Sequence, residues 1–292
     1  IGPADLHGDR KGGILVDKRP IGVFDSGLGG LTVVKELKKL LPHEDIIYFG
    51  DTGRVPYGTR SKEIITEYAC QDINFLLSHD VKMIIAACGT VSAVLPQSII
   101  ASLSIPFTGI LLPAVQAACA TSQNARIGVI GTPATIKSGA YGRAIRYIRS
   151  DAVVTGNACP LFVPLVENGY VKRSDKVTSL VASDYLKIFE GSGIDTMILG
   201  CTHFPIIRDI ISDMLEQDVT LINPGEETAR YTAAKLTKEH ILNDPQHEGN
   251  CRYYVSDAPE SFSEYGSLFL GEQIGGHVEK VDIGQLPANI TK

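Results

Sequence analysis

The chain has 292 residues, of which 44% are hydrophobic and 21% are charged, a composition typical of a globular protein with a sizeable core. Its 27 basic and 33 acidic residues give a net charge of −6, which favours neither nucleic acid nor a membrane surface as a partner. No apolar run is long enough to span a bilayer and the six cysteines form no CxxC pair, so we expect a cytoplasmic protein with reduced thiols.

Short apolar runs rich in β-branched residues alternate with amphipathic stretches along the chain. The runs predict buried strands at residues 21–24, 46–49, 83–87, 105–111, 127–130, 152–155, 197–199 and 219–222. The amphipathic stretches predict helices at residues 31–41, 62–78, 175–189, 206–215 and 227–239. This alternation is typical of parallel sheets that helices cover on both faces, and it places the chain in the α/β class.

The two halves of the chain resemble each other weakly. The segment IGVFDSG from Ile21 is echoed by IGVIGTP from Ile127, and MIIAACGT from Met83 is echoed by MILGCTH from Met197. In each half, a strand ends in a small polar turn and a later strand ends in a cysteine. The alternative is that strands of parallel sheets simply look alike, but the matched cysteines favour two pseudo-symmetric, mainly parallel-sheet domains that face each other.

The repeat also predicts domain limits. We assign residues 20–113 together with 226–272 to the first domain, and residues 114–225 to the second. Residues 1–19 are rich in Gly, Asp and Lys, and we expect a leader or a remnant of expression without regular structure. Residues 273–292 are expected to form a C-terminal tail.

Cys88 and Cys201 hold matching positions, each directly after a predicted strand and shortly before a predicted helix. Ligands of open α/β sheets bind beyond the carboxyl ends of the strands, and the positive end of a helix dipole favours a thiolate. Two such thiols can supply a base to one face of a carbon and an acid to the other, which is what inversion of a C–H centre requires. The alternative is that both are small buried hydrophobic residues.

Two polar loops follow other predicted strands. The turn DSGLGG from Asp25 lacks both the GxGxxG spacing and a P-loop lysine, so it is either an anion-binding turn or a plain tight turn. Asp25 itself is either a helix N-cap or a carboxylate that moves a proton to or from Cys88. The loop GDTGRVPYG from Gly50 is either a surface turn or a substrate-binding lid in which Tyr57 and backbone N–H groups meet a carboxylate.

Five motifs resemble those of the bacterial glutamate racemases in order and spacing, namely FDSGLGGLTV, GDTGRVPYG, GVIGTPATIKSGAY, PLVENG and LGCTHFP. The resemblance runs from about Ile21 to at least Asn223, and extends more weakly to the wider aspartate/glutamate racemase superfamily. It implies two flavodoxin-like or Rossmann-like domains with the active site in the cleft between them. It also implies interconversion of L- and D-glutamate without a cofactor or metal, supplying D-glutamate for peptidoglycan, in a homodimer.

The resemblance further implies residue roles. Cys88 looks like the base that acts on D-glutamate, assisted by Asp25, and Cys201 looks like the base that acts on L-glutamate, assisted by Glu167 and His203. From the residues alone, Glu167 would be a solvated loop acid and His203 a helix-capping residue. Positions that match substrate contacts are Asp25, Ser26, Pro56, Tyr57, Gly58, Gly89, Thr90, Thr132, Thr135 and Thr202.

Gly89 departs from the family pattern, in which an Asn commonly follows the first cysteine. Loss of an Asn hydrogen bond to a charged substrate group would cost about 1.5–3 kcal/mol unless water or the Gly89 N–H replaces it. Two alternatives therefore stay open at this point. The chain could be a racemase of another acidic amino acid, such as aspartate, or a non-catalytic module that binds an anionic ligand.

Overall fold

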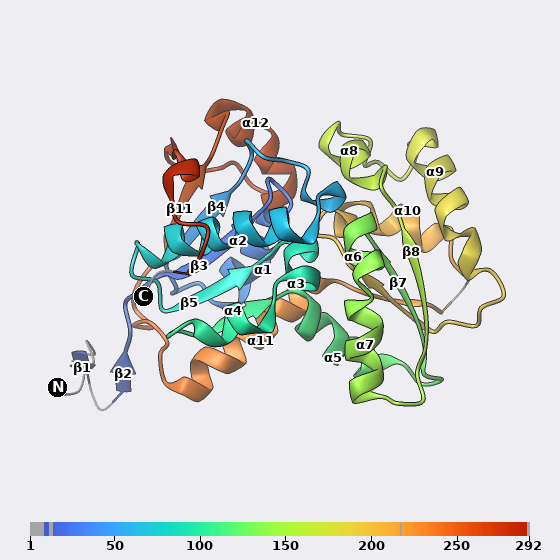
Figure 1. The fold of residues 1–292 in the computed structure, drawn as a ribbon, viewed down its shortest axis with the longest axis horizontal. Coiled ribbons are helices and arrows are strands. Elements are labelled where there is room, and N and C mark those ends of the chain that lie inside the picture. The colour runs from blue at the N-terminus through green and yellow to red at the C-terminus, as the bar shows by residue number, and fades with distance from the viewer. Residues whose placement is uncertain (1–8, 12–13, 217, 291–292) are drawn as a thin grey trace.

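The computed structural model describes residues 9–11, 14–216 and 218–290, and it divides into two α/β halves that lie side by side (Figure 1). The strands of the first half are β3 (Ile21–Asp25), β4 (Ile46–Gly50), β5 (Met83–Ala86), β6 (Phe107–Gly109), β11 (Cys251–Val255) and β12 (Val278–Lys280). Those of the second half are β7 (Arg126–Gly131), β8 (Val153–Ala158), β9 (Thr196–Leu199) and β10 (Thr220–Ile222). Every pair of neighbouring strands within these two sheets is parallel.

The two sheets repeat one strand order. The first sheet runs β12-β11-β4-β3-β5-β6 and the second β10-β9-β7-β8, so β4-β3-β5-β6 corresponds to β8-β7-β9-β10. The predicted pair of pseudo-symmetric parallel-sheet domains is confirmed. In the first sheet the chain runs outward from β3 to one side and from β5 to the other, and in the second sheet the same change occurs between β7 and β9. Open α/β sheets bind ligands at such switch points.

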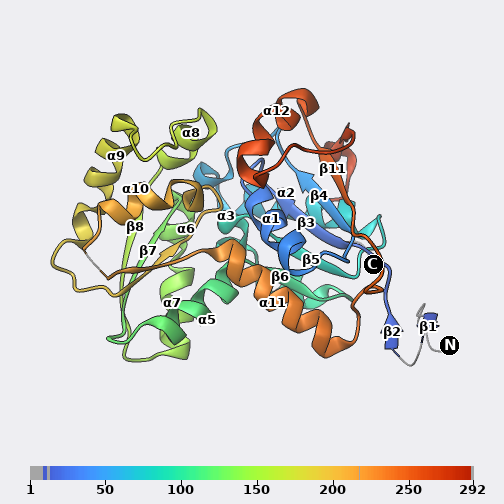
Figure 2. The same ribbon diagram turned by 180° about the vertical axis from the view of Figure 1, so that it is seen from behind.

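Helices cover both faces of the larger sheet. Ile46 and Tyr48 of β4 pack into the apolar cluster that contains residues of α1 (Leu31–Leu40) and α11 (Pro224–Glu239), whereas Ile47 and Phe49 pack with α2 (Lys62–Leu77). Figure 1 shows α2 over the near face of this sheet, and Figure 2 shows α1, α11 and α12 (Pro259–Leu270) over the other. The period of two that alternates side chains between faces explains why these strands are apolar throughout.

The remaining helices connect the strands and join the halves. α11 packs against both α1 of the first half and α5 of the second. Within the residues that the structure describes, no helix combines the length and apolar character needed to cross a membrane. The other helices are α3 (Gly89–Val94), α4 (Gln97–Ser102), α5 (Leu111–Thr121), α6 (Pro133–Ser138), α7 (Ala140–Ile148), α8 (Phe162–Glu167), α9 (Lys176–Leu186), α10 (Arg208–Asp213) and the short turns η1 (Tyr57–Thr59), η2 (Lys187–Phe189), η3 (Phe204–Ile207) and η4 (Ile283–Gln285).

Several predicted elements differ in extent from those observed. The strand predicted at 105–111 is reduced to β6, because α5 already begins at Leu111 and its first turn accommodates Pro113. The helix predicted at 206–215 is split into η3 and α10. The helix predicted at 175–189 is likewise divided, into α9 and η2.

The C-terminal segment does not behave as the predicted tail. Residues 278–280 form β12, which pairs with β11 as the outer strand of the six-stranded sheet, with Tyr253 opposite Val278. Neither β11 nor β12 was predicted, because short strands near a sheet edge lack a continuous apolar run. The exact domain limits stay a prediction.

The N-terminal segment is partly structured. Within the predicted leader, residues 1–8 and 12–13 lie outside the described residues, while β1 (Asp9–Lys11) and β2 (Ile14–Val16) pair antiparallel. Asp17 is buried, its backbone N–H donates to Leu242 O at 3.1 Å, and its carboxylate binds Arg19 at 2.6 Å. The expectation of an unstructured leader up to residue 19 was therefore wrong for this last part.

A buried ion pair ties this segment to the fold. Lys82 and Glu44 are almost fully enclosed, with 2.5 Å between Nζ and Oε2. Lys82 also donates to the carbonyls of Asp17 at 2.8 Å and Ile241 at 2.7 Å, and Glu44 accepts the Asn243 N–H at 2.8 Å. This charge pair and its hydrogen bonds therefore join four segments that are distant in sequence, around residues 17, 44, 82 and 241–243.

We expect Lys82→Met to lower the free energy of unfolding by about 3–5 kcal/mol, because it leaves the Glu44 carboxylate buried without a counter-charge. Arg173→Met, which breaks the exposed pair with Asp213, serves as the control and should cost about 1 kcal/mol or less. Urea unfolding measures both, and adding Glu44→Gln to Lys82→Met should recover part of the loss. Equal effects of the two single substitutions would contradict the assignment.

Candidate active site

One cavity of about 300 Å³ lies at the carboxyl ends of β3, β5, β7 and β9 and takes its walls from both halves. It contains both predicted cysteines and every predicted site residue except Thr135. Its lining residues are Asp25, Ser26, Gly27, Val55, Pro56, Tyr57, Gly58, Thr59, Cys88, Gly89, Thr90, Thr132, Pro133, Pro160, Val163, Pro164, Glu167, Cys201, Thr202 and His203. The residues that the sequence motifs singled out therefore converge in space.

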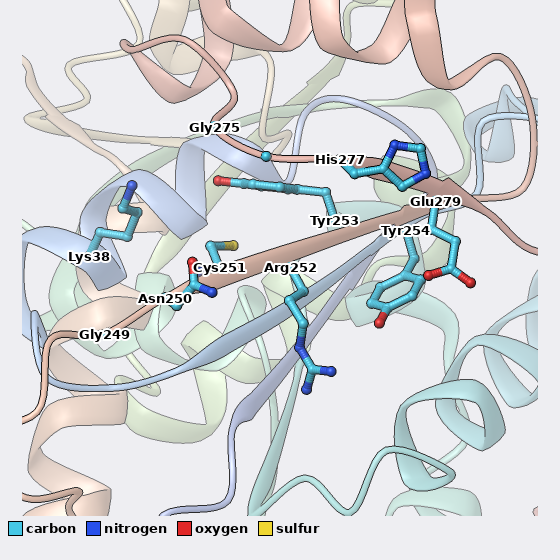
Figure 3. A pocket seen from close by; sticks show the side chains of 11 residues that line it. Lys38, Gly249, Asn250, Cys251, Arg252, Tyr253, Tyr254, Gly275, His277 and Glu279 are labelled. Atoms are coloured by element: carbon cyan, nitrogen blue, oxygen red, sulfur yellow. The ribbon is translucent and has the colours of Figure 1, made fainter.

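A larger cavity of about 440 Å³ lies along β11, between Lys38 of α1 and the segment around His277 (Figure 3). The side chains around it include Arg252 and Glu279, which point outward from neighbouring strands. None of the predicted site residues lines it. The chemistry-bearing cluster and this larger cavity are therefore different places.

Cys88 follows β5 and caps the N-terminus of α3. Its Sγ lies 3.7 Å from Ser26 Oγ, and the side chain is buried. Burial, followed by the nearby Asp25 carboxylate, raises the pKa of Cys88 to about 12. The helix terminus was expected to favour a thiolate here, but burial outweighs it, and Cys88 is a thiol at neutral pH.

Asp25 is the last residue of β3 and is almost completely buried. Its Oδ2 accepts the Gly27 N–H at 3.0 Å, and Tyr48 donates to Gly27 O at 2.8 Å, which anchors the turn. Burial raises the pKa of Asp25, although His203 and backbone N–H groups of the turn oppose the shift. Asp25 and Cys88 are thus two neighbouring buried acids, and burial raises the pKa of each.

Cys201 has a different environment. Its Sγ lies 3.8 Å from Nδ1 of His203, whose Nε2 lies 3.0 Å from Oε1 of Glu167. Burial alone would lower the pKa of His203, but the hydrogen bonds to Cys201 and Glu167 outweigh it and raise the pKa to about 10. His203 is therefore an imidazolium at neutral pH, held between the Cys201 thiol and the Glu167 carboxylate.

A chain of hydroxyl groups crosses from one half to the other. Thr90 Oγ1 lies 3.0 Å from Thr132 Oγ1, which lies 2.9 Å from Thr135 Oγ1. Thr132 caps α6 and accepts the Thr135 N–H at 3.3 Å. Thr135 is buried behind Thr132 and does not line the cavity, so it can support the hydroxyl chain rather than contact a ligand.

Glycines allow the two halves to approach closely. A Cβ on Gly29 would overlap the side chains of Thr202 and His203, and a Cβ on Gly89 would overlap the carbonyl oxygen of Gly200. In this backbone, then, a side chain on residue 89 would meet Gly200 rather than a ligand. Gly89 presents its backbone to the cavity.

Some wall residues escaped the sequence analysis. Val55, Thr59, Pro160, Val163 and Pro164 line the cavity. Val55 lies in the GDTGRVPYG motif and Pro164 opens the PLVENG motif, so these two motifs could have signalled part of this wall. The described residues contain no group of three His, Cys, Asp or Glu side chains that could hold a metal ion.

Comparison with known proteins assigns the family. The family model described as "Asp/Glu/Hydantoin racemase" matches residues 21–232. The chain belongs to this racemase family. A curated relative from Geobacter metallireducens, named glutamate racemase, is 44% identical over 88% of this chain and 94% of its own length. A Neisseria meningitidis relative of the same name is 44% identical over 91% of this chain and 98% of its own length.

Solved structures of racemases share the fold. The crystal structure of the Francisella tularensis glutamate racemase in complex with D-glutamate matches with a TM-score of 0.85 and 41% identity, covering 91% of this chain and 98% of that one. The Thermus thermophilus glutamate racemase in complex with β-chloro-D-alanine matches with a TM-score of 0.83 and 40% identity, covering 92% and 99%. The two-domain architecture is therefore that of known racemases.

We expect Glu167→Gln to lower the pKa of His203, because it removes one of the two partners that hold it near 10. The interaction of protonated His203 stabilises the fold fully below pH 6.5 and is lost as the pH rises through about 10. The free energy of unfolding should therefore differ more between the wild type and Glu167→Gln below pH 6.5 than above pH 10. NMR titration of the ring and urea unfolding at both pH values measure the two effects.

Glu190→Gln, which removes an exposed carboxylate from the same half, is the matched control. An unchanged His203 titration in Glu167→Gln would show that Glu167 does not set the charge of this histidine.

Proposed function

We propose that this protein interconverts L- and D-glutamate, with Cys88 and Cys201 as the two acid/base groups. The observation that carries the proposal is that both thiols line one cavity, each following the equivalent strand of its own domain. The 44% identical relatives named glutamate racemase support the choice of substrate. They favour it over aspartate and over a non-catalytic binding module.

The different surroundings of the two thiols support a direction for each. Beside the imidazolium of His203, Cys201 acts as the thiolate that removes the α-proton of L-glutamate. Cys88, whose pKa is raised to about 12, holds the proton that is delivered to the opposite face of the carbanion. The product is D-glutamate, with a thiol at Cys201 and a thiolate at Cys88.

In that second state the enzyme is prepared for D-glutamate, and the same steps run in reverse. Asp25, beside Cys88, and His203, beside Cys201, are the groups that restore protons between turnovers. Glu167 holds His203 in position and keeps it charged. We therefore assign catalytic roles to Cys88, Cys201, Asp25, Glu167 and His203.

The α-proton of an amino acid is a very weak acid, so the site must stabilise the carbanion. Backbone N–H groups at Gly89 and Thr202, together with the hydroxyls of Thr90 and Thr132, are donors of residues that line the cavity. The apolar wall of Val163 and Pro164 excludes water, which strengthens these interactions. In this arrangement the Gly89 N–H takes the place of the Asn side chain common in the family.

We also propose that the protein works in the cytoplasm, where it supplies D-glutamate for peptidoglycan, and that it forms a homodimer. All six cysteines are unpaired, which suits a reducing compartment.

Exchange in deuterated water tests the two-thiol mechanism. Cys201→Ser should lose α-proton exchange with L-glutamate, and Cys88→Ser should lose it with D-glutamate, because each removes the base for one enantiomer. Both variants should lose racemisation. NMR of the α-position and polarimetry measure exchange and inversion separately.

Cys119→Ser alters a buried cysteine outside the cavity and is the matched control, with near-native activity expected. Near-native turnover of both enantiomers by either cleft variant would overturn the mechanism. Faster turnover of aspartate than of glutamate by the wild type would overturn the substrate assignment.

Every step proposed above uses groups of the chain itself. We therefore expect dialysis against a chelator and treatment with hydroxylamine to leave the racemisation rate unchanged. Inactivation by hydroxylamine would indicate a carbonyl cofactor such as pyridoxal phosphate, and inactivation by a chelator that added metal reverses would indicate a metal.

A further inference from the structure

A cluster of buried charges lies behind the loop that forms one wall of the cavity. Asp51, Arg54 and Tyr57 come from the loop itself, and Asp72 comes from α2. Arg54 donates to Asp51 Oδ2 at 2.6 Å and to Asp72 Oδ1 at 3.1 Å, and its guanidinium lies 4.0 Å from the centre of the Tyr68 ring. The cluster therefore joins the cavity loop to the helix beneath it.

The Tyr57 hydroxyl is used within this cluster. It donates to Asp51 Oδ2 and also lies 3.2 Å from Asp72 Oδ2, and the side chain is 1% exposed. One of the two interpretations of the loop predicted that Tyr57 meets the substrate carboxylate. Because its hydroxyl is engaged here, Tyr57 contributes its ring and backbone to the cavity wall.

The charges of the cluster do not balance if both acids are ionised. The side chains of Asp51 and Asp72 are 0% exposed, and they share one guanidinium. An uncompensated carboxylate in such a place is costly, and proteins commonly relieve it by protonation.

Counting hydrogen-bond donors indicates which acid carries the proton. Asp51 has three donors, namely Arg54, Tyr57 and the Ser256 hydroxyl at 2.7 Å. A phenol has one proton, and Tyr57 gives it to Asp51, so the contact between Tyr57 and Asp72 has a donor only if Asp72 is itself protonated.

We propose that Asp72 is a protonated positioning residue that donates to Tyr57, while Tyr57 donates to ionised Asp51, and that this neutral relay holds the cavity loop in its substrate-binding position. The proposal rests on the proposed racemase function. Burial, and then Asp51, raise the pKa of Asp72 well above its ordinary value, in the same sense. Other titratable groups near Asp72 are Arg54, Tyr57, Asp25 and Cys70.

The relay matters for substrate because the loop reaches the other half of the cavity. Pro56, Tyr57 and Gly58 line the cavity, and a Cβ on Gly58 would lie within 2.8 Å of Thr132 Cβ in the second half. Displacement of Tyr57 would move this wall away from Thr132 without altering either thiol. The expected consequence is weaker substrate binding rather than slower proton transfer.

Two isosteric substitutions distinguish the roles of Asp51 and Asp72. Asp72→Asn keeps a donor toward Tyr57 and an acceptor toward Arg54, so KM for both enantiomers should change about threefold or less. Asp51→Asn removes the charge that Arg54, Tyr57 and Ser256 converge on, so KM should rise about tenfold or more, with a smaller change in kcat. Steady-state kinetics with each enantiomer measure both values, and kcat/KM must stay equal for the two enantiomers in every variant.

An infrared measurement tests the protonation state independently of activity. The wild type should show the C=O stretching band of a buried carboxylic acid that is absent from Asp72→Asn. Absence of that band from the wild type, or a KM in Asp72→Asn raised as much as in Asp51→Asn, would overturn the proposal. If the wild type does not racemise glutamate, the proposed function fails, while the infrared band still decides the state of Asp72.

Discussion

The site depends on the close backbone approach of two similar domains. The proposed reaction needs two thiols on opposite sides of one carbon, and here the ends of two separate sheets meet at glycines. Gly89 faces the carbonyl of Gly200, and Gly29 faces His203, at separations that leave no room for a Cβ. The repeated strand order then places a cysteine after the equivalent strand of each sheet.

Equivalent positions do not give the two cysteines equal chemistry. Cys88 lies near a buried carboxyl group, and Cys201 lies near an imidazole that a second carboxylate supports. Burial raises the pKa of Cys88, whereas the group beside Cys201 is a cation. In the proposed reaction, this difference between two equivalent positions assigns each thiol to one enantiomer of the substrate.

Buried charges outside the cavity hold the parts that form it. Lys82 and Glu44 fix the segments around the first sheet, and the Asp51 cluster fixes one wall of the cavity. Such groups are costly to bury unless every donor and acceptor is satisfied, so they specify one arrangement more strongly than apolar packing alone. This is why loops rich in glycine can still present a defined surface to a ligand.

The sequence by itself determined the α/β class, most of the strands, the internal repeat and the pair of cysteines, because period-two and period-3.6 patterns and strand-end motifs are local properties. The family resemblance supplied Asp25, Glu167 and His203 as helpers. Only the tertiary structure decided that the C-terminal residues join the first sheet, that the Tyr57 hydroxyl serves Asp51, and that burial outweighs the helix terminus at Cys88. These outcomes depend on which distant groups come into contact and on how much water they lose, and no local pattern contains either quantity.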